Sequence, residues 1–255
     1  MLIQRILAPL LVFATLLLFV NGVFASTVQC PARDSVNVVG EARSIKDNQL
    51  LYCEYYSEDT VTQQLRVEYY DQANTLIVVK DVDYSVSMLA PSVRQTDYRH
   101  GELRVAERLE NAQQYRLTYL PPNSDEDAIA DATINAEDNL VVDAGFDKAI
   151  RSQWDGLSRG EKRRFSFAAP PNLRTFTLVV QKVNQTDCLG QSYNANEQVC
   201  LLVKSSSTFL NWFIKPIVLI YDRNSQRLMR FVGGVNITND KGKSQRAEIN
   251  YHYLQ

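Results

Sequence analysis

Residues 143–160, DAGFDKAIRSQWDGLSRG, carry the most regular helical pattern in this chain of 255 residues. Large apolar side chains recur there at spacings of four, four and three, which places them on one face of a helix. They are Phe146, Ile150, Trp154 and Leu157. Asp143 is suited to the N-cap of such a helix, and Gly160 to its C′ position. The stretch therefore predicts one amphipathic helix whose apolar face is buried.

Runs of alternating apolar and polar residues lie on both sides of this helix. In residues 246–253, RAEINYHY, every second side chain is alanine, isoleucine or tyrosine. Such alternation, with polar turns between the runs, is typical of antiparallel strands that have one buried face. A lone amphipathic helix must bury its apolar face against those strands. We therefore expect a mainly β (α+β) protein, in which an antiparallel meander forms a curved sheet or incomplete barrel around one main helix at about residues 143–158.

The first 25 residues have the layout of a secretory signal peptide. Arg5 supplies a positive charge, Leu7–Val20 is almost wholly apolar, and Val23-Phe24-Ala25 offers a cleavage site. The alternative is a membrane anchor, but the apolar run is shorter than the ~20 residues that cross a bilayer. We therefore expect cleavage after Ala25, export of the chain, and no stable membrane span afterwards.

The remaining residues, 26–255, are numerous enough for one sizeable domain. The sequence near 121–131 begins PPNSDED and predicts an exposed connector, yet neither side of it would cover the helix alone. We therefore expect a single β-rich domain. The net charge of −2, with both signs scattered along the chain, gives no general attraction to nucleic acid.

Four cysteines follow the signal segment: Cys30, Cys53, Cys188 and Cys200. An even number of cysteines in an exported chain favours disulfides. The stretch between the last two is rich in turn residues, so we expect Cys188 to pair with Cys200 and Cys30 to pair with Cys53. Zinc is the competing explanation, but the chain has no CxxC spacing and both histidines are distant in sequence from the cysteines. We therefore expect disulfides and no metal site.

Several stretches together carry a family resemblance. They are residues 65–82 (LRVEYYDQANTLIVVKDV), 97–102 (DYRHGE), 142–147 (VDAGFD), 154–157 (WDGL) and the hairpin at 227–235. In these the chain resembles an uncharacterised family of exported proteobacterial proteins. The resemblance implies a Gram-negative periplasm and supplies no catalytic residues to transfer. By fold analogy, the helix-plugged pattern is also similar to the incomplete β-barrels of periplasmic lipoprotein carriers.

Signals of catalysis are few. The chain contains no GxSxG, HExxH or glycine-rich phosphate loop. Asp97, Arg99 and Glu102 form the one cluster suited to chemistry, because two carboxylates beside a guanidinium can act as acid, base and clamp. The other interpretation of the same residues is a salt-bridged hairpin. We expect no enzymatic activity and no cofactor.

Two clusters are suited to binding. Residues 159–164 contain Arg159, Lys162, Arg163 and Arg164, a local positive patch that can hold a lipid phosphate or another anion. The alternative is that these are solvated charges on a strand and on the last helical turn. Residues 208–216, TFLNWFIKP, can form a flap over a cavity or touch a membrane, or they can be buried against the sheet.

The leading hypothesis is therefore a periplasmic, non-enzymatic protein that binds an apolar or amphipathic ligand, such as a lipid or acyl chain, as a carrier or sensor. The candidate ligand-binding residues are Phe146, Ile150, Trp154, Arg163, Arg164, Phe209, Trp212 and Phe213. One alternative is a structural or interaction protein of the cell envelope with a filled core. Another is a hydrolase that uses Asp97 and Glu102. The expected partners are a lipid or hydrophobic small molecule, or an envelope protein, but not nucleic acid.

Overall fold

The computed structural model describes residues 29–110, 113–207 and 215–254. Its strands fall into two sets along the chain. The first set is β1 (Val38–Ser44), β2 (Leu50–Asp59), β3 (Gln64–Tyr70), β4 (Leu76–Asp83), β5 (Ser92–Asp97), β6 (Leu103–Arg108), β7 (Gln114–Leu120) and β8 (Ala130–Asn135). The second is β9 (Leu140–Val142), β10 (Arg163–Ala169), β11 (Arg174–Val183), β12 (Gln198–Ser205), β13 (Ile217–Asp222), β14 (Leu228–Gly234) and β15 (Arg246–Tyr253). The helices are α1 (Gly145–Ser152) and α2 (Trp154–Ser158), and the 3₁₀ turns are η1 (Glu126–Ala128), η2 (Pro170–Asn172) and η3 (Gln185–Asp187).

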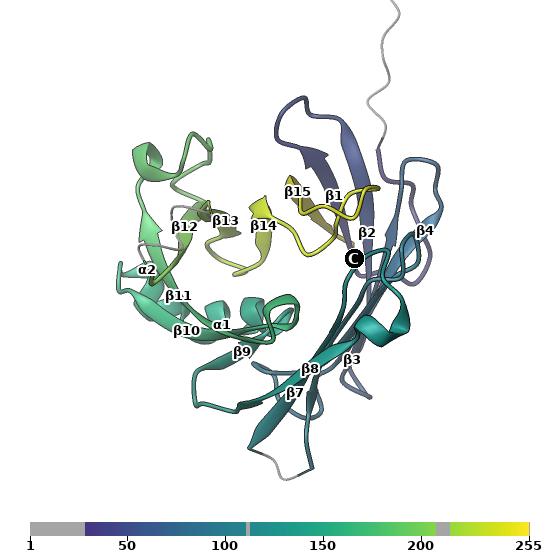
Figure 1. The fold of residues 1–255 in the computed structure, drawn as a ribbon. Helices are drawn as coiled ribbons and strands as arrows, with labels where there is room; N and C mark the ends of the chain where they lie inside the picture. The colour runs from purple at the N-terminus through teal and green to yellow at the C-terminus, as the bar shows by residue number, and fades with distance from the viewer. Residues whose placement is uncertain (1–28, 111–112, 208–214, 255) are drawn as a thin grey trace, which may run out of the picture.

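All the described strands join in one sheet, because the last strand pairs with the first. The order is β8-β7-β6-β5-β4-β3-β2-β1-β15-β14-β13-β12-β11-β10-β9. Each pair is antiparallel except β9 with β10, which is parallel. In Figure 1 the sheet curls so that β10–β13 stand on one side and β1, β2 and β4 on the other. The expectation of a mainly antiparallel, curved and incompletely closed sheet is confirmed.

The predicted single helix at about 143–158 is wrong in one respect, because the structure divides it in two. At Gln153 the backbone leaves helical geometry, with φ −108° and ψ 15°, and its N–H bonds to the carbonyl of Ile150. The break lets α1 contact β9 while α2 contacts β11. One straight helix would not follow the curvature of the sheet between those strands.

The two predicted helix ends differ in outcome. Asp143 is not the N-cap: Ala144 holds that position, and Asp143 has a positive φ of 40°. Its carboxylate instead accepts hydrogen bonds from Lys80 Nζ and Asn236 Nδ2, at 2.6 and 3.0 Å. Gly160 is confirmed at the C′ position, with a φ of 94° that favours glycine.

The helices lie on the concave side of the sheet. Lys148 Nζ of α1 is 3.5 Å from Glu58 Oε1 of β2 and 5.2 Å from the ring centre of Tyr84, which follows β4. On the opposite side, the Trp154 ring of α2 lies 5.7 Å from that of Tyr221 on β13. We call the helix-facing surface of the sheet the inner face and the other surface the outer face.

Both predicted disulfides are confirmed. Cys30 pairs with Cys53, and Cys188 pairs with Cys200. The second bridge holds the β11–β12 connection on the outer face, where both cysteines are fully buried in one apolar cluster with Val183, Leu202 and Ile220. No described helix has the length and apolar character needed to cross a membrane. The predicted signal peptide, residues 1–25, lies outside the described residues.

Candidate functional site

The helix residues predicted to bind ligand are packed side chains. Ile150 is fully buried and Trp154 is 7% exposed. Phe146 is half-buried, and its ring makes edge-to-face contacts with Phe165 and Phe167 of β10, with ring centres 5.8 and 6.0 Å apart. These contacts place the apolar face of the helices in the core beneath β10–β13.

The inner face of the other half of the sheet carries buried polar groups. Glu54 of β2 is 3% exposed, and its Oε2 accepts a hydrogen bond from the Tyr56 hydroxyl at 2.5 Å. Burial raises the pKa of Glu54 to about 7, although the hydrogen bond from Tyr56 and the nearby charge of Lys80 act in the opposite direction. A Cβ at Gly40 of β1 would lie only 2.8 Å from Glu54 Oε2, so glycine makes room for this carboxylate.

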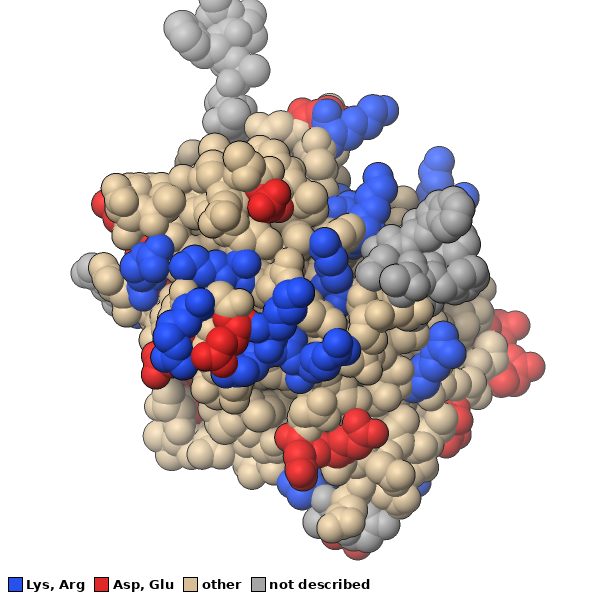
Figure 2. Space-filling model, turned by 90° about the vertical axis from the view of Figure 1, so that its left-hand side faces the viewer, with Lys and Arg blue, Asp and Glu red and all other residues tan. Residues whose placement is uncertain are grey.

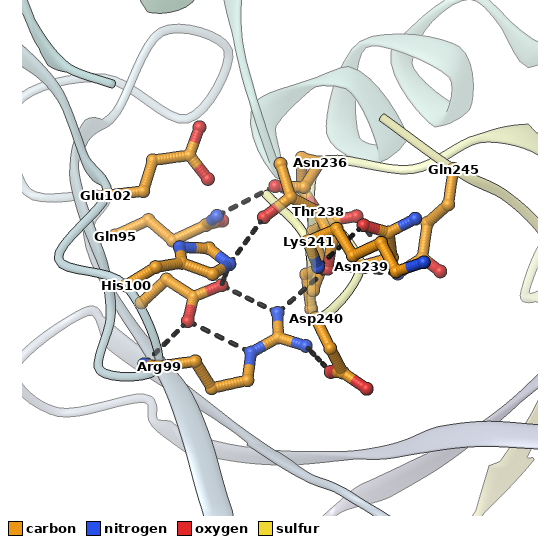
Figure 3. Close-up of polar contacts among 12 residues, drawn as sticks. Gln95, Arg99, His100, Glu102, Asn236, Thr238, Asn239, Asp240, Lys241 and Gln245 are labelled. Atoms are coloured by element: carbon orange, nitrogen blue, oxygen red, sulfur yellow. Dashed lines mark hydrogen bonds and ion pairs between the residues drawn. The ribbon is translucent and has the colours of Figure 1, made fainter. Parts of the chain in front are cut away.

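The connection between β14 and β15, residues 235–245, is fixed to the β5–β6 hairpin by a second polar network (Figure 3). Arg99 donates hydrogen bonds to both carboxylate oxygens of Asp97, to Asp240 and to the carbonyl of Thr238. The Thr238 hydroxyl lies 3.0 Å from His100 Nε2. The salt-bridged hairpin is therefore present, and it anchors this connection.

The geometry of this network is not that of a Ser-His-Asp catalytic triad. Asp97 and Glu102 are each 1% exposed, and each is held by an arginine, Arg99 and Arg104 respectively. Asp97 approaches the Nε2 of His100 at 3.6 Å, the same nitrogen that faces Thr238. A catalytic triad instead needs the carboxylate on the opposite ring nitrogen, so that Nε2 can accept the proton of the nucleophile.

A groove lies on the outer face of β10, β11 and β12, where it encloses about 300 Å³. We call it the basic groove. Its lining residues are Lys162, Arg164, Val179, Gln181, Leu202, Lys204, Ser205 and Ser206.

Strand register explains why these residues meet. Arg164 pairs with Val179, and Val179 pairs with Lys204, so the three side chains form one row across three strands. Gln181 pairs with Leu202 in the neighbouring row. With strands about 4.8 Å apart, Arg164 and Lys204 stand ~10 Å from each other over an apolar floor of valine and leucine.

The cations of the groove have no carboxylate partner among the residues that the structure describes. Lys162, Arg164 and Lys204 are exposed and form no ion pair there, whereas Glu161 binds Arg159 at 3.0 Å and Arg163 at 2.5 Å. Figure 2 shows lysine and arginine side chains gathered over this side of the molecule. In a chain of net charge −2, the groove is a local concentration of positive charge.

The predicted basic patch at 159–164 is therefore divided between two environments. Side chains alternate along β10, so Arg164 lines the groove while Arg163 lies against Gly156 of α2. Lys204 and Gln181, which the sequence did not single out, complete the groove. Phe209, Trp212 and Phe213 lie outside the described residues.

A metal centre is not seen in the described part of the chain, where no three histidine, cysteine, aspartate or glutamate side chains gather in a way that could hold an ion. The groove is lined by ammonium, guanidinium, hydroxyl and amide groups, which can donate hydrogen bonds to an anion.

No family model matches the chain, and no curated protein sequence matches it. Among solved structures, the chain is similar to a protein from Brucella abortus described as a beta-barrel-like protein of domain of unknown function DUF1849. The two are 8% identical, the match covers 86% of this chain and 96% of that one, and the TM-score is 0.39.

Proposed function

We propose that this protein is an exported, non-enzymatic binding protein whose basic groove takes an amphipathic anion. The observation that carries the proposal is the row of Arg164, Val179 and Lys204. It sets two cations, neither of them paired with a described carboxylate, around an apolar floor. A phosphate or carboxylate head would lie between the cations, and a short apolar segment would cover Val179 and Leu202. Both attractions favour the same molecule, one that is charged at one end and apolar at the other.

The inner face is less suited to such a ligand. The rings of Phe146 and Trp154 fill the space between the helices and β10–β13. Glu54, Lys80 and Asp143 occupy the space beneath β2 and β4, where an acyl chain would meet buried charges. We therefore place the ligand on the outer face of the sheet and not in the helix-lined interior that the sequence pattern indicates.

Export to a periplasm, with removal of residues 1–25 and one domain from 26 to 255, is part of this proposal. The N-terminal sequence pattern supports it. The two disulfides also support it, because such bonds persist in oxidising compartments.

Titration calorimetry with monododecyl phosphate, below its micelle concentration, tests the function. Inorganic phosphate is the probe of the head alone, and dodecyltrimethylammonium is the probe of the same chain with a cationic head. We expect the unmodified protein to bind dodecyl phosphate more tightly than either probe. The double variant Arg164→Ala/Lys204→Ala should weaken that binding by at least about tenfold, since charged hydrogen bonds contribute ~1.5–3 kcal/mol each. Arg94→Ala, an exposed cation on β5, is the matched control and should bind normally.

Failure of the unmodified protein to bind dodecyl phosphate, or equal binding by the double variant, would overturn the proposal. The packed inner face would then favour the second candidate, an interaction protein of the cell envelope with a filled core. Pull-down from solubilised envelopes, repeated with Arg164→Glu, would test that candidate.

A further inference from the structure

The basic groove contains a third cation, Lys162, beside the pair on which the proposed function rests. The register of β10 with β11 places Lys162 opposite Gln181, one residue beyond the first pair of the ladder. Lys162 and Arg164 are alternate residues, so their Cα atoms are ~7 Å apart on the same face. The row of Lys162 and Gln181 therefore lies next to the row of Arg164 and Lys204.

The three cations stand on both sides of β11. Lys162 and Arg164 lie on the β10 side, and Lys204 lies on β12, ~10 Å from Arg164. Lysine and arginine have long, flexible stems, so their charged ends can converge on one anionic head above Val179. No aspartate, glutamate or histidine is among the residues that line the groove. The lining itself therefore supplies no negative charge to balance these cations.

The groove also offers neutral hydrogen-bond donors. The backbone N–H of Ser206 donates to the carbonyl of Thr177 at 2.8 Å, which holds Ser206 against β11. The hydroxyl of Ser206 and the amide of Gln181 are then further donors at the groove. A tetrahedral head with three terminal oxygens can accept from more of these groups than a planar carboxylate, which has two oxygens.

We infer that the head of the ligand is a phosphate monoester in its dianionic form. The inference rests on the proposed function, because it names the head of the ligand that binds in the same groove. A phosphate monoester carries about 1.5–2 negative charges near pH 7 and has three terminal oxygens. A carboxylate or a phosphate diester carries a single charge, so it leaves most of the positive charge of Lys162, Arg164 and Lys204 unbalanced. The monoester matches the groove in both charge and oxygen count.

Titration calorimetry with different heads on one dodecyl chain tests the inference, at concentrations below micelle formation. The ligands are monododecyl phosphate, dodecyl methyl phosphate (the corresponding diester) and dodecanoate. We expect the monoester to bind at least about tenfold more tightly than either of the others, because a monoanion forgoes one or more charged hydrogen bonds. Inorganic phosphate distinguishes an alkyl phosphate from the free anion. If it bound as tightly as the monoester, the apolar floor would contribute nothing and the proposed function would be wrong.

The pH dependence of binding gives a second readout. The charged groups that face the head are Lys162 and Arg164 from the β10 side and Lys204 from β12, and β11 contributes none. The second proton of a phosphate monoester leaves with a pKa of about 6. Affinity for monododecyl phosphate should therefore rise as pH increases through that value, whereas affinity for the diester should stay constant.

Lys162→Ala tests the inference from the protein side. Loss of the third cation should weaken binding of the monoester at least about tenfold and change binding of the diester by less than about threefold in screening salt. Lys241→Ala, which removes an exposed lysine from the connection between β14 and β15, is the matched control and should leave both affinities unchanged.

The outcomes separate this inference from the proposed function. Equal affinity for the monoester, the diester and dodecanoate would overturn the inference and leave the proposed function intact, because the groove would still bind an amphipathic anion. A Lys162→Ala variant that loses affinity for monoester and diester equally, or for neither, would also overturn the inference. Absence of binding to all three dodecyl ligands would instead contradict the proposed function.

Discussion

The two faces of β10–β12 are built from alternate residues of the same strands, and they differ in almost every physical property. On the inner face, Phe165, Val180 and Leu201 are buried against the helices. On the outer face, Arg164 and Lys204 are exposed and form no ion pair with the described carboxylates. Alternation lets one strand serve the core with one set of side chains and a ligand with the other. Inner-face variants should therefore affect stability, and outer-face variants should affect binding.

The largest effect is expected at Trp154, which is 7% exposed and stacks at a tilt on Tyr221. Trp154→Ala removes a large core side chain and should lower the free energy of unfolding by about 3–5 kcal/mol. Denaturant titration measures the loss. At a temperature where the variant is still folded, its dodecyl phosphate affinity should be normal. A small stability loss together with weak ligand binding would instead return the ligand to the inner face.

The next effect concerns pH and the buried carboxylate of Glu54. Its folded-state pKa of about 7 lies above the ordinary value of 4.5, so the folded protein retains this proton after the unfolded chain has released it. The free energy of unfolding should therefore fall by about 3 kcal/mol as pH rises from about 4.5 to beyond 7. Burial also raises the pKa of Asp147, which adds a decrease of the same sign.

Glu54→Gln isolates this contribution, because the glutamine side chain stays neutral. The difference in unfolding free energy between the variant and the unmodified protein, followed by urea titration at several pH values, should change across this interval. Identical pH profiles for the two proteins would show that Glu54 ionises normally.

Substitution of two glycines by alanine compares how tightly the inner and outer sides of the sheet are packed. A Cβ at Gly145 of α1 would fall well inside the van der Waals distance of the Leu89 carbonyl, whereas one at Gly234 meets open space. Gly145→Ala should cost about 1–3 kcal/mol through displaced backbone, and Gly234→Ala should stay within ~0.5 kcal/mol of the unmodified protein. Thermal unfolding of both variants measures the contrast. Equal melting temperatures would mean that α1 does not press on the segment before β5.

Periodicity along the chain predicted much of the fold. The spacing of Phe146, Ile150 and Trp154 identified the buried helical face, and alternation in 246–253 identified a strand with one inward side. Both properties depend on residues that are close together in the sequence, so the sequence alone reveals them. The break at Gln153 was not predicted, because it depends on the curvature of the sheet that the helices cover.

The candidate site was less predictable, because it depends on register between distant strands. Arg164 was singled out from its basic neighbours, but Lys204 lies forty residues away and joins it only through Val179. Asp143 is a second case in which a contact between residues distant in sequence decides the role of a side chain. Its type and position indicated an N-cap, yet the ammonium of Lys80 from β4 binds its carboxylate. A partner 63 residues away has no signature in the local pattern.

The smallest effect on stability is expected from the double variant Arg164→Ala/Lys204→Ala, and its sign is informative. Two like charges ~10 Å apart in water repel by about 0.4 kcal/mol before salt is added. With no described carboxylate paired to either residue, their removal should raise the free energy of unfolding by a few tenths of a kcal/mol at low ionic strength. The gain should vanish in salt, where the Debye length falls below that separation. Differential scanning calorimetry at low and high salt measures this gain in stability.

A stability loss in the double variant would mean that the cations support the fold. A gain that salt removes would mean that the fold tolerates their repulsion, as expected of residues placed for a ligand.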